Sequence, residues 1–202
     1  MNLKETYNFI AEDWHKDHMN DDWWVEGTNA FVAFLKPGDL VLDVGCGSGT
    51  KSKYLIEKGL RVVGVDFSEN MINIAKREVS GGIFYTLDMR EVGKLGQMFD
   101  GIFMQASLLH IPRNEAESVL KAMTTQLQPG GYLYVAVKEK KPGKRDEEIE
   151  REDDYGYPYE RFFSYFTLDE IRGYMHSIGC DVCYEAEATP KSRWVQVIGK
   201  KK

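Results

Sequence analysis

The stretch Val41–Thr50, which reads VLDVGCGSGT, decides the fold of this 202-residue chain. An apolar run ends in Asp43, three glycines follow at alternate positions, and a helix-like segment, 50–58, comes next. This order predicts a strand, a glycine-rich turn and a helix. Glycine has no Cβ and readily adopts positive φ, so such a turn lets a ligand lie directly against the backbone. The free N–H groups in the first turn of the helix would point at that ligand.

The spacing of the glycines and the acid before them distinguish between two kinds of ligand. The dinucleotide fingerprint has glycine at its first, third and sixth positions, which here are Gly45, Gly47 and Thr50, so the third glycine is missing. Asp43 would repel a pyrophosphate and would attract a cationic ligand. S-adenosylmethionine has no phosphate and carries an ammonium and a sulfonium group. The charges therefore favour S-adenosylmethionine over NAD.

The pattern Asp-x-Gly-x-Gly-x-Gly resembles the first motif of the class I S-adenosylmethionine-dependent methyltransferases. In that family the acid lies near the methionine end of the cofactor, and the glycines let the backbone pass close to it. The resemblance covers about residues 40–199 and implies an α/β fold, a three-layer Rossmann-like sandwich with an N-terminal helical cap. Its seven-stranded sheet would be mostly parallel, with one antiparallel strand. We expect a single domain, 1–202, with the helical cap at 1–36 and a variable insertion or lid at 138–166.

Acidic residues follow the next two predicted strands, 61–66 and 83–87. Asp66 lies about 20 residues after the glycines, where a carboxylate can accept both ribose hydroxyls; the alternative is a helix N-cap. NAD-binding folds use the same acid, so Asp66 supports an adenosine ligand without choosing between the two cofactors. At Asp88 the resemblance implies a hydrogen bond from the adenine amino group, and the alternative is a surface turn acid.

The loop from Gln105 to Pro112 follows the fourth predicted strand and should face the transferred methyl group, because ligands bind at the carboxyl ends of such strands. It resembles the Leu-His-Ile segment of small-molecule methyltransferases and lacks the Asn-Pro-Pro-Tyr or Asp-Pro-Pro-Tyr loop of DNA amino-methyltransferases. His110 is the expected catalytic base, since its ordinary pKa is near neutral; packing or substrate contact is the alternative. The cofactor-binding residues that the resemblance implies are Tyr7, Asp43, Gly45, Cys46, Gly47, Gly49, Asp66, Phe67, Met71, Asp88, Met89, Gln105 and Ser107.

Two segments outside these motifs are candidates for a lid and for substrate selection. Residues 2–35 predict two helices that carry three tryptophans, which either pack the segment onto the domain or cover the cofactor. The stretch 144–154 has mixed charge and little to bury, so we expect a mobile loop there. Aromatic residues crowd into 155–166 and either select the substrate or hold the loop down. Arg161 and Tyr165 are the expected substrate contacts.

Composition argues against several other classes of protein without excluding a nucleic acid partner. A net charge of −6 disfavours a nucleic acid partner, and the longest apolar runs are too short to cross a membrane. No apolar signal segment is visible, and three scattered cysteines fit a reducing, cytoplasmic location better than a disulfide framework. We expect no metal site: His15 and His18 lie among carboxylates, but a solvated helix face explains them more simply. Cys180 and Cys183 are expected to be structural.

The sequence thus favours a methyltransferase that uses S-adenosylmethionine and acts on a small-molecule acceptor. The methyl group would move in line to a nitrogen or oxygen, or to sulfur or carbon, while the protein aligns, desolvates and where needed deprotonates the acceptor. One alternative is a protein that binds the cofactor without turnover. The other is an NAD-dependent oxidoreductase, against which Thr50 and Asp43 both argue.

Overall fold

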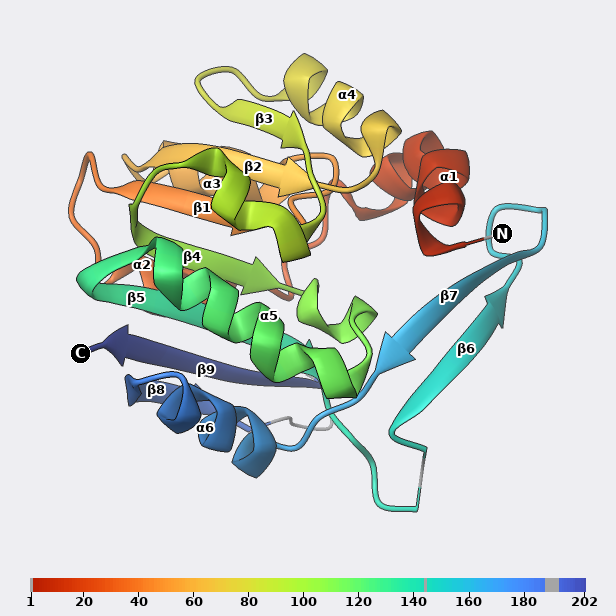
Figure 1. The fold of residues 1–202 in the computed structure, drawn as a ribbon. Coiled ribbons are helices and arrows are strands. Elements are labelled where there is room, and N and C mark those ends of the chain that lie inside the picture. Colours follow the sequence, from red (N-terminus) through yellow and green to blue (C-terminus); the bar gives the residue numbers. More distant parts are fainter. Residues whose placement is uncertain (1, 144, 188–192) are drawn as a thin grey trace.

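The computed structural model describes residues 2–143, 145–187 and 193–202 and has a seven-stranded sheet at its centre (Figure 1). The strands lie in the order β3-β2-β1-β4-β5-β9-β8, and β9 runs antiparallel to both its neighbours while the other pairs are parallel. The predicted sheet, mostly parallel with one antiparallel strand, is confirmed. Its strands are β1 (Leu40–Val44), β2 (Arg61–Asp66), β3 (Ile83–Thr86), β4 (Phe99–Gln105), β5 (Leu127–Lys138), β8 (Cys180–Ala186) and β9 (Trp194–Lys201).

Helices cover both faces of the sheet and complete the three layers (Figure 1). Neighbouring residues of β1 show the division, because successive side chains of a strand point to opposite faces. Val41 packs with Phe31 and Leu55 on one face, and Leu42 belongs to the larger core on the other. The first face carries α2 (Val25–Val32), α3 (Thr50–Glu57) and α4 (Glu69–Glu78), and the second carries the short 3₁₀ helix η1 (Met89–Leu95), α5 (Arg113–Gln126) and α6 (Leu168–Ser177).

The parallel strands end at one edge of the sheet, and the chain changes direction there. The backbone N–H groups of Gly45 and Cys46 both donate to the carbonyl oxygen of Val65, at 2.8 and 3.0 Å, so the chain turns off the sheet directly after β1. From β1 the chain builds β2 and β3 to one side, and β4 and β5 to the other. Such a switch point leaves a crevice at the carboxyl ends of the strands, where ligands of this fold class bind.

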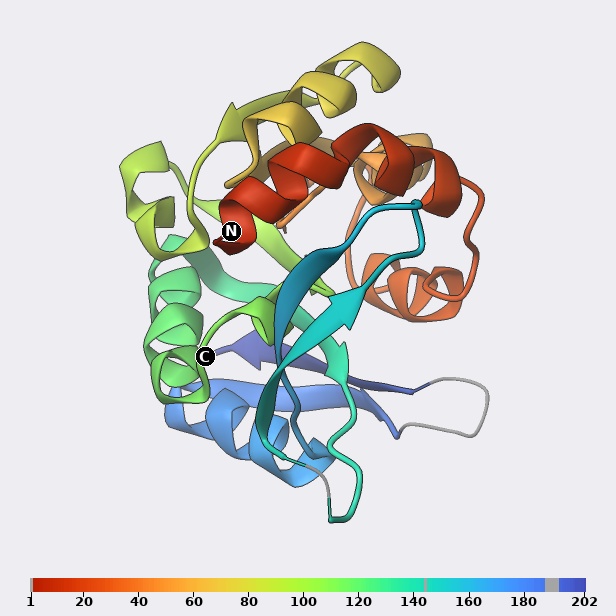
Figure 2. The same cartoon turned by 90° about the vertical axis from the view of Figure 1, so that its right-hand side faces the viewer.

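Helix α1 (Leu3–His18) lies across that edge, beside α4 and the strand β7 (Tyr159–Ser164) (Figure 2). Asn2 begins the helix with a capping box, and the helix residues Ile10 and Ala11 are buried against the domain. Asn8 holds the helix to α4: its side-chain oxygen accepts a 2.7 Å hydrogen bond from Ser68 Oγ. The two helices predicted for residues 2–35 are confirmed as α1 and α2. Among the described residues, no helix combines the length and apolarity needed to cross a bilayer.

The expectation of a mobile loop over 144–154 is wrong for the part of that stretch that the structure describes; Lys144 lies outside the described residues. Here β6 (Glu147–Glu152) pairs with β7 (Tyr159–Ser164) in an antiparallel hairpin. Charged residues sustain these strands because their charges pair across the hairpin, Arg151 with Glu160 and Arg161 with Glu152. The inward-facing ring of Phe163 is also buried, so one face of the hairpin packs onto the domain.

Candidate active site

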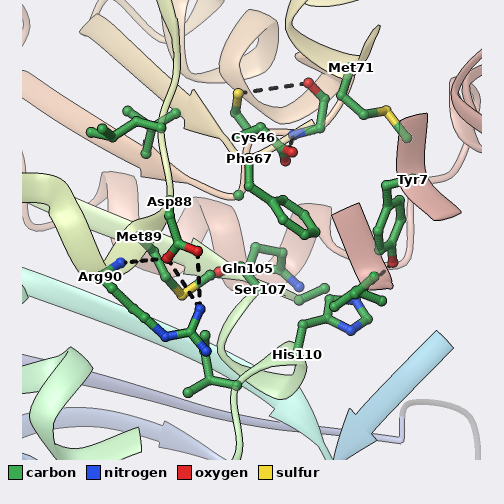
Figure 3. A pocket seen from close by; sticks show the side chains of 18 of the residues that line it. Tyr7, Cys46, Phe67, Met71, Asp88, Met89, Arg90, Gln105, Ser107 and His110 are labelled. Atoms are coloured by element: carbon green, nitrogen blue, oxygen red, sulfur yellow. Dashed lines mark hydrogen bonds and ion pairs between the residues drawn. The ribbon is translucent and has the colours of Figure 1, made fainter. Parts of the chain in front are cut away.

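A cavity lies at the carboxyl edge of the sheet, below α1 (Figure 3). Its walls come from the loop after β1, the ends of β2 and β3, the loop after β4, and α1. His110, the expected base, lines it, and so do eleven of the thirteen residues expected to bind the cofactor. Those eleven are Tyr7, Gly45, Cys46, Gly47, Asp66, Phe67, Met71, Asp88, Met89, Gln105 and Ser107.

The three glycines of the loop have positive φ but serve two purposes. Gly45 (φ 71°) passes so close to the loop after β4 that a Cβ there would lie 2.5 Å from Ser107 Cβ. Gly47 (φ 53°) faces the cavity below the Trp14 ring. Gly49 (φ 86°) lies outside the cavity lining, and a Cβ there would lie 2.8 Å from Val79, the C-cap residue of α4. The first two therefore leave room at the cavity, whereas the third lets α3 pack closely on α4.

Asp66 ends β2 with its carboxylate buried against the glycine loop. Oδ2 accepts a hydrogen bond from the Gly47 N–H at 3.0 Å, and Oδ1 accepts one from the Ser68 N–H at 2.9 Å. Burial raises the pKa of Asp66 to about 6, and these two hydrogen bonds oppose that shift. The N-cap of α4 is Ser68 rather than Asp66. Each carboxylate oxygen has a second lone pair, so Asp66 can still accept hydroxyl groups.

Asp43 lies beneath the glycine loop and does not line the cavity. Ser52 Oγ donates to its Oδ2 at 2.6 Å, which ties the first turn of α3 to the end of β1. Burial raises the pKa of Asp43 to about 6, opposed by the Ser52 hydrogen bond and the charge of Lys51. The structure therefore lets Asp43 act on a ligand through its charge and through the loop that it supports.

Asp88 lies both at the start of a helical turn and in the wall of the cavity. It begins η1, where its Oδ1 accepts the Arg90 N–H at 2.9 Å, and it lines the cavity (Figure 3). Its Oδ2 also lies 3.0 Å from the Arg90 guanidinium. Arg90 in turn contacts Glu115 at 2.7 Å, so this end of the cavity has paired charges.

His110 lies in the short 3₁₀ helix η2 (Leu108–His110) with both ring nitrogens engaged. Nδ1 is 2.8 Å from the carbonyl oxygen of Phe162, which can only accept, so Nδ1 carries the proton. Nε2 is then an acceptor, and the Tyr7 hydroxyl donates to it at 2.8 Å (Figure 3). Burial lowers the pKa of His110 to about 3, against the Phe162 hydrogen bond and with help from the charges of Arg161 and Lys138. The imidazole is neutral at physiological pH.

A second cavity adjoins the first, and four residues line both: Tyr7, Trp14, Ala106 and His110. It extends below the β6–β7 hairpin, and the two expected substrate residues, Arg161 and Tyr165, both line it. Arg161 forms an ion pair with Glu152, and its Nη1 lies 3.4 Å from the Tyr7 hydroxyl. Lys138 Nζ lies 3.6 Å above the Phe163 ring in the same cavity.

The structure also brings in residues that the sequence patterns did not indicate as ligand contacts. Lys51, Trp14 and Arg90 line the first cavity. Helical periodicity placed Trp14 on a face of α1 but could not show which element that face covers. Ala106 has φ 59°, a left-handed conformation that is costly for a residue with a Cβ, and it lies where the two cavities meet. Within the described ranges, no cluster of three His, Cys, Asp or Glu side chains could hold a metal ion.

Comparison with known proteins finds sequence similarity to methyltransferases. Residues 41–131 match the family model described as a methyltransferase domain. The chain is 35% identical over 164 residues to phosphoethanolamine N-methyltransferase 1 of Zea mays, covering 77% of this chain and 32% of that protein. It is 32% identical over 124 residues to the putative methyltransferase YqeM of Bacillus subtilis. That match covers 58% of this chain and 48% of YqeM. The chain thus spans about a third to a half of the length of these curated relatives.

Two solved structures share the fold at low sequence identity. One is the 1,6-didemethyltoxoflavin-N1-methyltransferase of Burkholderia thailandensis, with a TM-score of 0.77 and 19% sequence identity. The match covers 99% of this chain and 87% of that enzyme's chain. The other is the magnesium protoporphyrin IX methyltransferase of Synechocystis PCC 6803, with a TM-score of 0.74 and 19% sequence identity. The match covers 100% of this chain and 98% of that enzyme's chain. Nearly the whole length of this chain therefore superposes on most of each of these two structures.

Proposed function

The chain belongs to the class I S-adenosylmethionine-dependent methyltransferase family, and from this premise we propose that it moves the cofactor's methyl group to a small-molecule acceptor. The observation that carries the proposal is the convergence of side chains from five separate segments on one cavity, with the carboxylate of Asp66 beside the glycine loop. Asp66 would accept the two ribose hydroxyls. The segment Asp88–Met89 would meet the adenine ring. The relatives with solved structures contain S-adenosylmethionine or S-adenosylhomocysteine, which supports the same cofactor here.

The second cavity is the proposed acceptor site, with Arg161 and Tyr165 in its wall. It joins the cofactor cavity at Tyr7 and His110, so an acceptor atom placed there would face the transferred group. The cofactor supplies an electrophilic methyl group when bound. The chain's own part is to align the acceptor, exclude water and remove a proton where one must leave.

His110 is the proposed proton acceptor, but burial lowers its pKa to about 3 and makes it a weaker base than the near-neutral imidazole expected from the sequence. The hydrogen-bond pattern adds a second condition to that role. Its Nε2 faces the Tyr7 hydroxyl, so a proton from the acceptor would reach His110 through Tyr7 or after that hydroxyl turns away. The carbonyl of Phe162 holds the ring in the tautomer that leaves Nε2 unprotonated. For an acceptor that needs no deprotonation, the same pair would serve as a contact surface.

The relatives' substrates give a first set of acceptors to test. The curated maize relative acts, by its name, on phosphoethanolamine, and others are named as ubiquinone biosynthesis O-methyltransferases. We therefore propose a small amine or hydroxyl compound as the acceptor and not nucleic acid, which the net charge of −6 disfavours. We further propose that residues 1–202 form one domain, with cap 1–36 and lid 138–166, and that it works in the cytoplasm, where its three free cysteines suit a reducing environment.

Calorimetric titration of S-adenosylmethionine, S-adenosylhomocysteine and NADH into wild type and Asp66→Ala tests the cofactor. We expect the two sulfur compounds to bind the wild type, NADH not to bind, and Asp66→Ala to lose most of the affinity. Binding of NADH alone would replace the proposal with an oxidoreductase. Transfer of a labelled methyl group to a panel of amines, phenols and carboxylates then separates an enzyme from a protein that only holds the cofactor.

A further inference from the structure

Lys51 is a cation in the wall of the first cavity that the proposed function leaves without a role. It lies in the first turn of α3, directly after the glycine loop, and its side chain is partly buried. Its ammonium lies 5.8 Å from the ring centroids of both Trp23 and Trp24. These distances suit cation–π attraction, so the two indole rings hold the lysine side chain in place.

The charges around Lys51 leave its ammonium available to a ligand. In the described part of the chain, Lys51 Nζ makes no hydrogen bond or ion pair. Asp43 and Asp21 act on it only through their charges, which oppose the lowering of the pKa of Lys51 by burial. Asp43, whose charge acts on Lys51 more strongly than that of Asp21, already accepts the hydroxyl of Ser52.

Arg90, the other cationic residue in the wall of this cavity, differs from Lys51 because it has carboxylate partners. Arg90 is paired with Asp88 at 3.0 Å and with Glu115 at 2.7 Å, so its charge is neutralised within the protein. Lys51 is therefore the lining Lys or Arg side chain that has no carboxylate partner among the described residues. A partly buried ammonium without a carboxylate partner is stabilised by an anionic group of the ligand, because charge-assisted hydrogen bonds are stronger than neutral ones.

The position of Lys51 indicates which anionic group of a ligand would pair with it. Asp66 and Asp88 follow β2 and β3, on one side of β1 in the sheet, where the proposed function places ribose and adenine. Lys51 follows β1 itself and lies against Trp23, whose ring stacks on Trp194 of β9, on the other side of β1. Lys51 does not line the second cavity, so an anionic group of the acceptor is not its natural partner. The amino-acid end of the cofactor carries one carboxylate, and it would lie beside Gly45 and Gly47.

We propose that Lys51, held between Trp23 and Trp24, binds the carboxylate of the cofactor's methionine moiety and thereby sets the preference of this site for a ligand that retains that carboxylate. This inference rests on the proposed function, because it assumes that S-adenosylmethionine occupies the first cavity. Lys51 is a binding residue in this proposal and takes no part in methyl transfer.

The test combines removal of the charge on the protein with removal of the charge on the ligand. S-adenosylmethionine and decarboxylated S-adenosylmethionine, which lacks only the carboxylate, are titrated calorimetrically into wild type, Lys51→Met and Lys51→Arg. Lys53→Met is the matched control, because Lys53 lies on the same helix but is exposed and lines neither cavity. Methionine keeps most of the length and the apolar character of the lysine stem, and it removes the charge together with the cation–π attraction to the indole rings.

We expect Lys51→Met to bind S-adenosylmethionine about tenfold to a hundredfold more weakly than wild type, while its affinity for the decarboxylated compound stays within about twofold. Lys51→Arg should recover part of the loss, and Lys53→Met should match wild type. Equal weakening of both ligands, or no weakening of either, in Lys51→Met would overturn the assignment. A wild type that binds neither ligand would instead refute the proposed function, and retained binding of the decarboxylated compound shows that a variant is folded.

Discussion

At the scale of single residues, Asp66 makes cofactor binding depend on pH. Burial raises its pKa to about 6, and the ionised form is the one that accepts both ribose hydroxyls. Lowering the pH through 6 protonates the carboxyl group in the free protein, so affinity should fall on the acid side and not on the alkaline side. We expect the dissociation constant of S-adenosylhomocysteine to be about tenfold higher at pH 5 than at pH 7.5.

Asp66→Asn is the matched variant for this measurement. It should bind more weakly throughout but with a flat profile between pH 5 and 7.5. A wild-type profile that is already flat contradicts the role given to Asp66. Since burial raises the pKa of Asp43 to a similar value, a slope that persists in Asp66→Asn would assign the titration to Asp43.

Gly45 is the residue at which a single methyl group should be least tolerated in the loop. Its φ of 71° and the 2.5 Å approach to Ser107 Cβ mean that Gly45→Ala adds both strain and a clash. We expect a loss of about 2–4 kcal/mol in the free energy of unfolding, measured in urea, together with loss of S-adenosylhomocysteine binding. Gly96→Ala is the control, because Gly96 has φ 62° but open space around its Cβ position; it should cost about 1 kcal/mol and leave binding intact.

At the scale of elements, α1 and the β6–β7 hairpin together cover the two cavities. Tyr157 of the hairpin turn donates to Asp13 of α1 at 2.6 Å and packs against Phe9, with ring centroids 4.6 Å apart. Arg161 of β7 reaches the Tyr7 hydroxyl. Elements distant in sequence thus meet above the site (Figure 2), where hydrogen bonds and an aromatic contact join them. Such a cover is suited to local opening without unfolding of the core.

Two arginines of the hairpin allow its stability to be tested with an internal control. Arg161 and Glu152 form a largely buried pair, with side-chain exposures of 16% and 17%, whereas Arg151, which pairs with Glu160, is 85% exposed. Arg161→Met leaves Glu152 without its partner and should cost about 1–3 kcal/mol, while Arg151→Met should change stability by less than about 0.5 kcal/mol. Amide hydrogen exchange should rise in β6 and β7 of Arg161→Met and stay unchanged in β1 and β4. Equal effects of both variants would show that the hairpin does not depend on the buried pair.

At the scale of the whole molecule, a cavity built from five segments should couple cofactor binding to global stability. A ligand that binds only the folded state stabilises it, so S-adenosylhomocysteine at a hundred times its dissociation constant should add about 2.7 kcal/mol. For a chain of this length that corresponds to a rise in melting temperature of roughly 5–10 °C. NADH at the same concentration should have no effect, and Asp66→Ala should lose most of the shift. Equal melting temperatures of wild type with and without S-adenosylhomocysteine would contradict occupation of this cavity.

The sequence by itself determined the α/β class, the parallel sheet and the main residues of the proposed cofactor site. These features depend on local signals: apolar runs long enough for buried strands, glycines in a turn, and acids at strand ends. Asp66 and Gly45 could be placed at the cavity because β1 and β2 must end at the same edge once they are parallel. The helices of the cap also followed from periodicity.

Only the tertiary structure decided what the remaining residues do. The hairpin of β6 and β7 was missed because its strands are held by pairing across the chain and by packing of one face, which local composition does not report. Lys51 reaches the cavity because Trp23 and Trp24, almost thirty residues away in sequence, hold its side chain there. Likewise, the protonation state of His110 depends on burial, on the carbonyl of Phe162 and on the Tyr7 hydroxyl. The physical reason is the same in each case: the decisive interactions join residues far apart in the chain, and they exist only once the fold has formed.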